Sequence, residues 1–382
     1  MSVLDAPAEV LRPNELEGID KPQETARGLP PRLYTDPEIF EVEKEKIFRR
    51  EWMAVFHESS VPNPGDFRVM EIAGDSFLFT RGDDGVLRAF HNICRHRGAK
   101  VATGEGNCSR FKCPYHTWTY DTNGKLVGAP AMAHVVREGI GLLEVSVTTW
   151  MGFVFINQDP DAQPLAERLA GLNEELGAFL NAGRLAHLYE IPYPGDWNWK
   201  LTNENAYESY HVLGSHFESA GALIPGELTY TRNTEFEYWS TFFNPYGEGL
   251  NSRDTTGGAV PFDNLPDWID QELRFYTIWP NIIVFFGPEA IFAGITIPGP
   301  THDRVSFNWN AAVLPESTRL PKFEEFREGQ MLVSNTIQTE DQYPCETMWA
   351  NVHSKAFIPG PYADQELASF HFDQWWLRRM AA

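Results

Sequence analysis

Two short pairs of cysteine and histidine constrain the fold of this chain more than any other feature of its sequence. Cys94 and His96 stand two positions apart, and after sixteen intervening residues Cys113 and His116 stand three apart. Thiolates and imidazoles at such spacings are typical metal ligands. The two loops that carry them are therefore expected to fold against each other around a metal centre.

The donor set suits either a structural Cys2His2 zinc site or a Rieske [2Fe–2S] centre. A zinc finger normally pairs Cys with Cys and His with His, whereas each pair here contains one of each. That distribution suits a cluster in which one iron takes both thiolates and the other takes both imidazoles. We predict a [2Fe–2S] centre, with Cys108 in the intervening loop as a small buried or free thiol.

A second group of metal-competent side chains lies in residues 198–216, NWKLTNENAYESYHVLGSH, which include Glu204, Glu208, His211 and His216. Glu208 and His211 would share one face of a helix, and Gly214 would let the chain loosen and bring His216 round. Taken alone, two such histidines are more often polar surface or core residues. Together with a carboxylate, they match the ligand set of non-haem Fe(II) oxygenases.

In this order, and about a hundred residues apart, the two motifs resemble the catalytic α subunit of the Rieske non-haem iron oxygenases, or ring-hydroxylating oxygenases. The resemblance covers nearly the whole chain. It implies an α+β fold with a small all-β Rieske domain and a helix-grip (START-like) catalytic domain, whose antiparallel sheet wraps around a long C-terminal helix. We divide the chain into an N-terminal arm and helix packing on the catalytic domain (1–51), a Rieske domain (52–157) and a mononuclear iron domain (158–382).

The resemblance also implies the third iron ligand. The segment QTEDQYPCETMWANVHS aligns Asp341 with an aspartate that joins the two histidines on the iron in relatives. Glu340 is less suited, because successive helical residues point about 100° apart. Trp349 stands where many relatives have glutamine. This difference keeps the three expected ligands but does not allow the shape of the pocket around them to be predicted.

Two further roles follow from the resemblance. Glu208 stands at the position of a carboxylate that bridges a cluster histidine of one subunit and the iron of the next. Most relatives have Asp there, and some quaternary-ammonium oxygenases have Glu. Asn205 is expected near the iron.

The activity implied is that of a terminal oxygenase, which uses O2 and electrons from NAD(P)H. No flavin or NAD motif is recognised in the sequence, so a separate ferredoxin or flavin reductase is expected, with a homotrimer as the assembly. We favour mono- or dioxygenation of an aromatic or related small organic substrate. The alternatives are oxidation of a quaternary-ammonium or N-methyl compound of the betaine or carnitine type, and a Rieske electron carrier with an inactive ligand-binding domain.

Composition bears on the expected partners and on the cellular location of the protein. The formal net charge of −22 over 382 residues argues against a nucleic-acid partner, and favours a basic redox partner or a cationic substrate. No apolar run reaches the roughly 18 residues of a membrane span, and the four cysteines suggest no disulfide framework. We expect a soluble cytoplasmic protein.

The local patterns agree with this division. Residues 1–30 are expected to be a loose arm, and Asp36-Pro37 to start a helix. Turns at Asp84-Gly85 and Asn123-Gly124 predict hairpins of strands 77–80 with 86–90, and 118–120 with 125–127. Residues 153–156 predict a further strand, and leucines from position 165 to 176 predict one helix after Pro164. Five strands are expected between 235 and 313, followed by a helix over 321–350.

Overall fold

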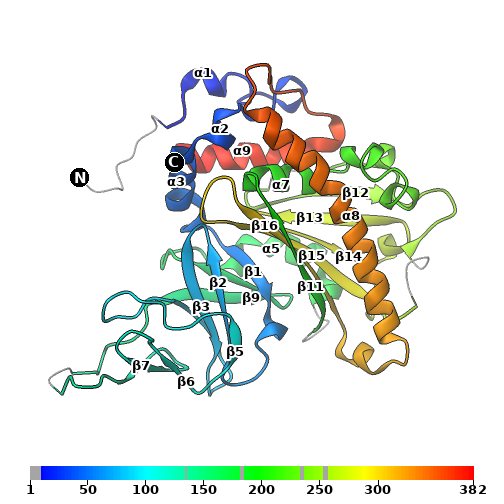
Figure 1. The fold of residues 1–382 in the computed structure, drawn as a ribbon. Helices are drawn as coiled ribbons and strands as arrows, with labels where there is room; N and C mark the ends of the chain where they lie inside the picture. The colour runs from blue at the N-terminus through cyan, green and yellow to red at the C-terminus, as the bar shows by residue number, and fades with distance from the viewer. Residues whose placement is uncertain (1–9, 134–135, 181–184, 233–235, 253–256) are drawn as a thin grey trace.

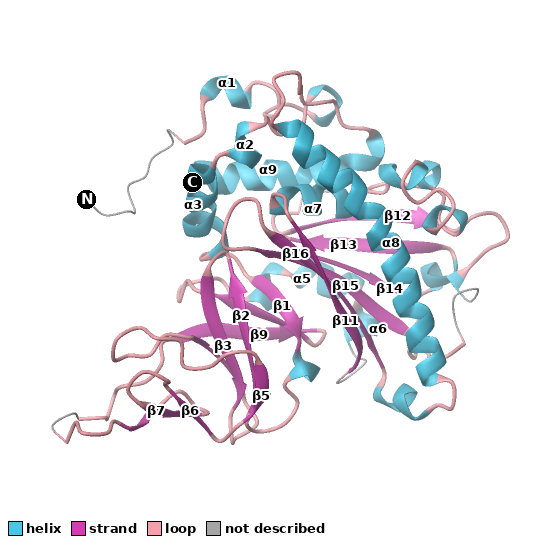
Figure 2. Cartoon of the chain, viewed as in Figure 1, coloured by secondary structure: helices cyan, strands magenta, loops and turns pink. Residues whose placement is uncertain are grey.

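The structure, a computed structural model, describes residues 10–133, 136–180, 185–232, 236–252 and 257–382. Figures 1 and 2 show a β-rich region formed by the first half of the chain beside a larger region in which helices cover an antiparallel sheet. The fold is α+β, as predicted.

The β-rich region contains two sheets. The larger has the strand order β1-β10-β9-β4-β3-β2-β5, and the smaller the order β6-β7-β8. Its strands are β1 Met53–His57, β2 Asp66–Ile72, β3 Asp75–Arg81, β4 Leu87–His91, β5 Glu105–Asn107, β6 Arg110–Lys112, β7 Thr119–Asp121, β8 Leu126–Gly128, β9 Glu144–Trp150 and β10 Phe153–Asn157. Both predicted hairpins are present. Their turns contain Gly85 and Gly124 with φ angles of 77° and 79°, a left-handed conformation that glycine adopts readily in tight turns.

The second region is built on a six-stranded antiparallel sheet with the order β11-β16-β15-β14-β13-β12. Its strands are β11 Ala186–Gly195, β12 Trp239–Pro245, β13 Glu272–Ile278, β14 Ile282–Phe286, β15 Ala290–Pro298 and β16 Val305–Val313. The 30-residue helix α8, Phe323–Val352, crosses this sheet (Figure 1) and contacts β11 and α7. This is the helix-grip arrangement that the resemblance implied.

The remaining helices are α1 Pro13–Leu16, α2 Arg32–Thr35, α3 Pro37–Glu43, α4 Leu165–Arg168, α5 Ala170–Glu175, α6 Gly177–Leu180, α7 Trp199–Ala206 and α9 Leu367–Ala381. Helix α3 begins as predicted: the Asp36 carboxylate accepts a hydrogen bond of 2.9 Å from the backbone N–H of Glu38. It continues as a π-helical turn, Lys44–Phe48.

The prediction of a loose arm is wrong for residues 10–30. Leu11, Ile19 and Leu29 are buried in the main core, and Gln374 of α9 donates a hydrogen bond of 2.6 Å to the Ile19 carbonyl. This segment covers the C-terminal helix, which explains why its apolar side chains show no period of their own. Residues 1–9 lie outside the described part of the chain.

The single helix predicted after Pro164 is also wrong. Leu169 and Leu176 have ψ angles of 13° and 10°, which interrupt the helix and give α4, α5 and α6. Both leucines are nevertheless buried, and Phe179 packs on Phe286 of the sheet with ring centroids 4.4 Å apart. The apolar spacing therefore identified the buried face but not the backbone breaks.

Across the described segments, no helix combines the length and the apolar character needed to span a bilayer. Helix α8 is long enough, but acidic and other polar residues occur along it.

Candidate iron and iron–sulfur sites

Helix α7 is held rigidly at its start. The Asn198 side chain caps it by accepting from the Lys200 N–H, and donates to the backbone carbonyls of Tyr34 and His302. The Lys200 ammonium forms an ion pair with Glu43 of α3, and both side chains are fully buried. The same glutamate accepts from the Trp199 indole at 2.8 Å. The sequence NWK therefore fastens α7 to the N-terminal helices.

The helix ends earlier than predicted. Helix α7 stops at Ala206, and the chain turns through Glu208 into a 3-10 segment, Tyr210–Leu213, that ends at Gly214. The expectation that Glu208 and His211 share a helical face is therefore wrong in detail, although the two side chains do meet. Glu208 accepts hydrogen bonds from His211 at its backbone N–H (3.0 Å) and from its Nδ1 (2.6 Å).

His211, His216 and Asp341 converge, although Asp341 comes from α8. One donor atom from each lies within 4.8 Å of the other two. Nε2 of His216 is 2.9 Å, and Nε2 of His211 is 3.6 Å, from Oδ1 of Asp341. Two imidazoles and one carboxylate are the facial ligand set of non-haem iron, so these residues fit a mononuclear Fe(II).

Each histidine is held from behind by a carboxylate. Glu208 contacts Nδ1 of His211, and Glu340 contacts Nδ1 of His216 at 2.7 Å. Ser219 donates to the same oxygen of Glu340. Since each Nδ1 is engaged, both Nε2 atoms point to the shared position beside Asp341. Glu340 was regarded as the less suited ligand. In the structure it instead orients a candidate ligand, His216, a role that sequence spacing did not reveal.

These carboxylates also set the charge of the site. Burial acts against protonation of His211, but the neighbouring charges of Glu208 and Asp341 outweigh it and raise the pKa of His211 to about 9. Burial on its own would raise the pKa of Asp341. The hydrogen bond from His216 and the charges of the two histidines outweigh burial, so the pKa of Asp341 is lowered. The negative charge gathered here matches a cation bound between the three residues.

Other predicted residues fall as follows. Asn205 donates a hydrogen bond of 3.0 Å to Oδ1 of Asp341, so it does lie beside the candidate iron position. Gln338 donates to the other oxygen at 3.3 Å. Trp349 packs between His302 and His353 and is not among the residues that line the cavity described next.

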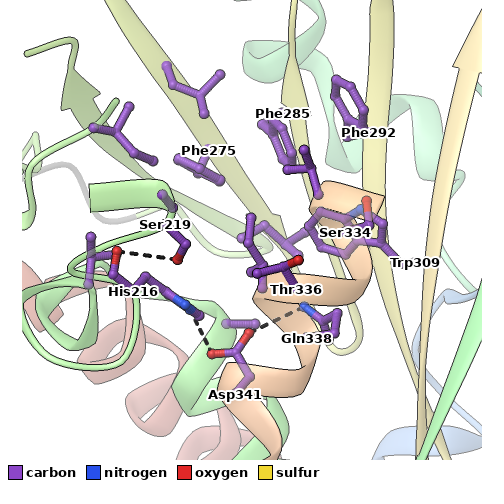
Figure 3. A pocket seen from close by; sticks show the side chains of 18 of the residues that line it. His216, Ser219, Phe275, Phe285, Phe292, Trp309, Ser334, Thr336, Gln338 and Asp341 are labelled. Carbon is purple, nitrogen blue, oxygen red and sulfur yellow. Dashed lines mark hydrogen bonds and ion pairs between the residues drawn. The ribbon is translucent and has the colours of Figure 1, made fainter. Parts of the chain in front are cut away.

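A cavity of about 590 Å3 opens beside the three candidate ligands. Figure 3 shows His216 and Asp341 at one end and the rings of Phe275, Phe285 and Trp309 farther along the wall. These rings come from β13, β14 and β16. Alternate side chains of a strand lie on the same face of a sheet, and the three rings lie on the face that lines the cavity. The strands predicted between residues 235 and 313 therefore contribute side chains both to the core and to this cavity.

The second site lies on two loops of the β-rich region. Cys94 and Cys113 are buried, and the rings of His96 and His116 are 4.6 Å apart at a tilt of 72°. The loops match in their backbones. Gly98 N–H donates to the Cys94 carbonyl, and Thr117 N–H donates to the Cys113 carbonyl.

The loop residues fit a Rieske cluster. Nδ1 of His96 is buried without a hydrogen-bond partner, as expected for a nitrogen directed at a metal. Its ring stacks on Trp118, with centroids 5.0 Å apart. Cys94 and Cys113 are free thiols, and Cys108 is also free and partly buried, as predicted.

Comparison with known families agrees with both sites. The Rieske [2Fe-2S] domain family matches residues 51–146, and the ring hydroxylating alpha subunit (catalytic domain) family matches residues 182–382. The first match decides between zinc and a Rieske centre in favour of the latter.

Individual relatives belong to the same group. The chain is 33% identical to the glycine betaine monooxygenase oxygenase subunit of Chromohalobacter salexigens, over 97% of this chain and 88% of that protein. It is 38% identical to the carnitine monooxygenase oxygenase subunit of Escherichia coli over 62% of this chain, but spans only 65% of that relative's length. Biphenyl 2,3-dioxygenase subunit alpha of Rhodococcus jostii is 33% identical over 60% of this chain and 50% of its own.

The fold has a solved counterpart. A crystal structure of a quaternary ammonium Rieske monooxygenase superposes with a TM-score of 0.78 at 22% identity, covering 94% of this chain and 97% of the other. The chain therefore belongs to the Rieske non-haem iron oxygenases, a family of oxidoreductases whose cofactors are a [2Fe–2S] cluster and a mononuclear iron.

Proposed function

We propose that this chain is the terminal oxygenase of a Rieske-type system that hydroxylates a carbon atom of a hydrophobic small organic substrate, with an aromatic ring as the first candidate. The observation that carries the proposal is the 590 Å3 cavity that begins at His211, His216 and Asp341 and continues between aromatic side chains. Pockets of this size enclose most of a small organic molecule. A bound ring would present a carbon to the candidate iron position.

We assign the ligands as the sequence suggested: Cys94, His96, Cys113 and His116 for the cluster, and His211, His216 and Asp341 for the mononuclear iron. When bound, these groups supply stored electrons and O2 activation. The protein orients the substrate and holds the ligand rings. Convergence of the three iron ligands argues against the alternative of an electron carrier with an inactive binding domain.

The cavity is a poor match for a small zwitterion. Among the described residues that line it, none is lysine or arginine. A substrate carboxylate entering this space would lose its hydration without gaining a counter-charge, which is unfavourable. These observations argue against carnitine and glycine betaine as substrates here, despite the names of two relatives.

A second candidate is an N-methylated cation without a carboxylate. The faces of Phe275, Phe285 and Trp309 offer the kind of surface on which a quaternary ammonium group is stabilised, and the neighbouring acidic residues favour positive charge. Attack on an N-methyl carbon would release formaldehyde, whereas attack on a ring would give a phenol or a cis-dihydrodiol.

A substrate screen tests the proposal. Reconstituted, reduced enzyme is incubated under 18O2 with biphenyl, naphthalene, phenyltrimethylammonium, carnitine and glycine betaine, and product mass and formaldehyde are followed. We expect one or two labelled oxygen atoms on a ring compound, or formaldehyde from phenyltrimethylammonium if the second candidate holds. Conversion of carnitine or glycine betaine alone contradicts the hydrophobic assignment.

We also propose a homotrimer in which Glu208 bridges to a cluster histidine of a neighbouring copy. Within one chain, the loops next to β6 and β7 lie far from the site between α7 and α8 (Figure 1). Large apolar side chains are exposed at both places: Tyr115 is 56% exposed, and Tyr210 and Phe217 are 47% and 70% exposed. Contact between copies would cover them. Sedimentation of the intact protein should give three times the chain mass, and a monomer would contradict this assignment.

A further inference from the structure

The cluster-bearing segment has a charge opposite to that of the whole protein. Residues 93–128 contain six basic and two acidic side chains, whereas the chain has a formal net charge of −22. The basic residues are Arg95, Arg97, Lys100, Arg110, Lys112 and Lys125. Positive charge is thus concentrated around the two loops that hold the cluster ligands.

Only one of these six residues has a carboxylate partner in the described chain. All six are exposed. Lys100 is ion-paired with Glu71, and the Arg95 guanidinium donates to the Gly141 carbonyl. By contrast, no carboxylate of the described chain forms an ion pair with the others. We call these four residues, Arg97, Arg110, Lys112 and Lys125, the basic surface.

Much of the basic surface lies on the flank of the small sheet. Arg110 and Lys112 occupy alternate positions of β6 and are exposed, while Phe111 between them is buried, so the two cations share the outer face. Arg110 pairs in register with Asp121 at the open end of the β6–β7 hairpin, and Lys112, at the loop end, is the residue before Cys113. The flank therefore leads directly to a cluster ligand.

The cluster itself does not need this much positive charge. With two thiolates, two sulfides, two neutral imidazoles and two ferric ions, a Rieske centre is neutral when oxidised and carries one negative charge when reduced. The four cations of the basic surface carry more positive charge than is needed to offset the single negative charge of the reduced cluster. Their exposure to solvent instead suits a partner that arrives from solution.

We propose that the basic surface is the docking site of an acidic electron-donor protein, an iron–sulfur or flavin protein whose reduced centre is surrounded by carboxylates. This inference rests on the proposed function, which requires such a donor. It reverses the expectation of a basic partner drawn from the net charge. At physiological salt, charges more than about 8 Å apart are largely screened, so a docking protein experiences the local positive field. The acidic remainder of the surface repels the donor from unproductive sites.

Cluster reduction without substrate tests this docking. The trimeric holoenzyme is mixed anaerobically with a reduced, acidic plant-type [2Fe–2S] ferredoxin, and the cluster absorbance is followed at several salt concentrations. The test variant is Arg110→Glu with Lys112→Glu. The control, Arg319→Glu with Lys322→Glu, makes the same charge change at exposed residues before and at the start of α8.

For the wild type, the second-order rate should fall about tenfold or more from low to high salt, because electrostatic steering is screened. The test variant should be about tenfold slower at low salt and nearly insensitive to salt, while the control stays within about twofold of the wild type. Reduction by the methyl viologen cation radical should not slow in the test variant.

Three results would overturn the inference. One is an unchanged ferredoxin rate in the test variant. Another is a shifted cluster reduction potential with slower reduction by every reductant, which would mean that the cations tune the cluster. The third is loss of the trimer on sedimentation, which would assign the surface to a second copy of the chain. Failure of the proposed function is a separate result, because O2 uptake would then be absent with every substrate while ferredoxin still reduced the cluster.

Discussion

Oε2 of Glu340 lies 2.7 Å from Nδ1 of His216, although the two residues are 124 positions apart in the chain. Glu208 stands in the same relation to His211, at 2.6 Å. Each candidate iron histidine is therefore oriented by a carboxylate, one from the turn after α7 and one from α8. Because Glu340 directly precedes Asp341, a single turn of α8 supplies both a ligand and the support of another ligand.

Replacing Glu340 should weaken iron binding. Glu340→Ala leaves Nδ1 of His216 without its acceptor, so the ring is free to turn, and we expect Fe(II) affinity to fall about 10–100-fold. Glu340→Gln keeps a neutral acceptor and should lose less. The measurement is Fe(II) titration of the apo enzyme, which does not depend on turnover. Glu346→Ala, an exposed glutamate on the same helix, is the control, and an equal loss in that variant would argue against a specific role for Glu340.

Replacing Glu208 should slow electron transfer between the cluster and the mononuclear iron, while both metal centres remain bound. In Glu208→Gln the side chain keeps its length but loses its charge, and the bridge between subunits is weakened. We expect reoxidation of the reduced cluster, in the presence of substrate and O2, to slow about 10–100-fold, with the cluster absorbance unchanged. Rapid-mixing spectroscopy gives the rate, and Glu218→Gln at an exposed neighbouring position is the control. Wild-type kinetics in the Glu208 variant would exclude the bridge.

The sequence predicted those parts of the site that depend on side-chain chemistry at short range. Cys94 with His96, Cys113 with His116, and His211 with His216 could be identified because donor type and spacing carry the signal. Glycine turn signals were equally reliable, as the hairpin at Gly124 shows, whereas apolar spacing did not reveal the helix breaks at Leu169 and Leu176.

Contacts between distant segments could not be predicted in this way. Glu204 was grouped with the metal-competent residues, yet both of its carboxylate oxygens lie 2.9 Å from the Tyr34 hydroxyl and share its single donated hydrogen bond. Helix α9 was missed because nearly all its faces are buried, which removes the helical period. Strand β11 was missed because it contains Pro192 and Pro194, which are tolerated on an edge strand.

The buried ion pair beneath α7 should matter for stability. Glu43 pairs with Lys200 and accepts from the indoles of Trp199 and Trp376. Glu43→Ala leaves a buried, uncompensated ammonium, so we expect the free energy of unfolding to fall by about 3–5 kcal/mol. Urea unfolding measures it. Glu41→Ala, which removes a 68% exposed partner of Lys44, should cost less than about 1 kcal/mol, and similar losses in both variants would refute the argument.

The last prediction concerns pH and the acidic pair behind the site. Tyr34 donates to Glu204, and Tyr362 donates to Asp373, which is buried. Burial, and then the neighbouring charge of Asp373, raise the pKa of Glu204 well above its ordinary value. Burial likewise raises the pKa of Asp373 to about 7. The folded protein therefore retains protons that the unfolded chain releases near pH 4.

A raised carboxyl pKa means that stability is lost as pH increases. For Asp373 the contribution is fully present below about pH 4 and is lost as pH rises through about 7. Asp373→Asn keeps a polar side chain that cannot ionise, so its free energy of unfolding should fall less between pH 5 and 8, by a difference on the order of 1–4 kcal/mol. Urea unfolding across this range measures the slope. Exposed Asp263→Asn should run parallel to the wild type, and a wild-type curve with no decline near pH 7 would show that Asp373 is already ionised in the folded state.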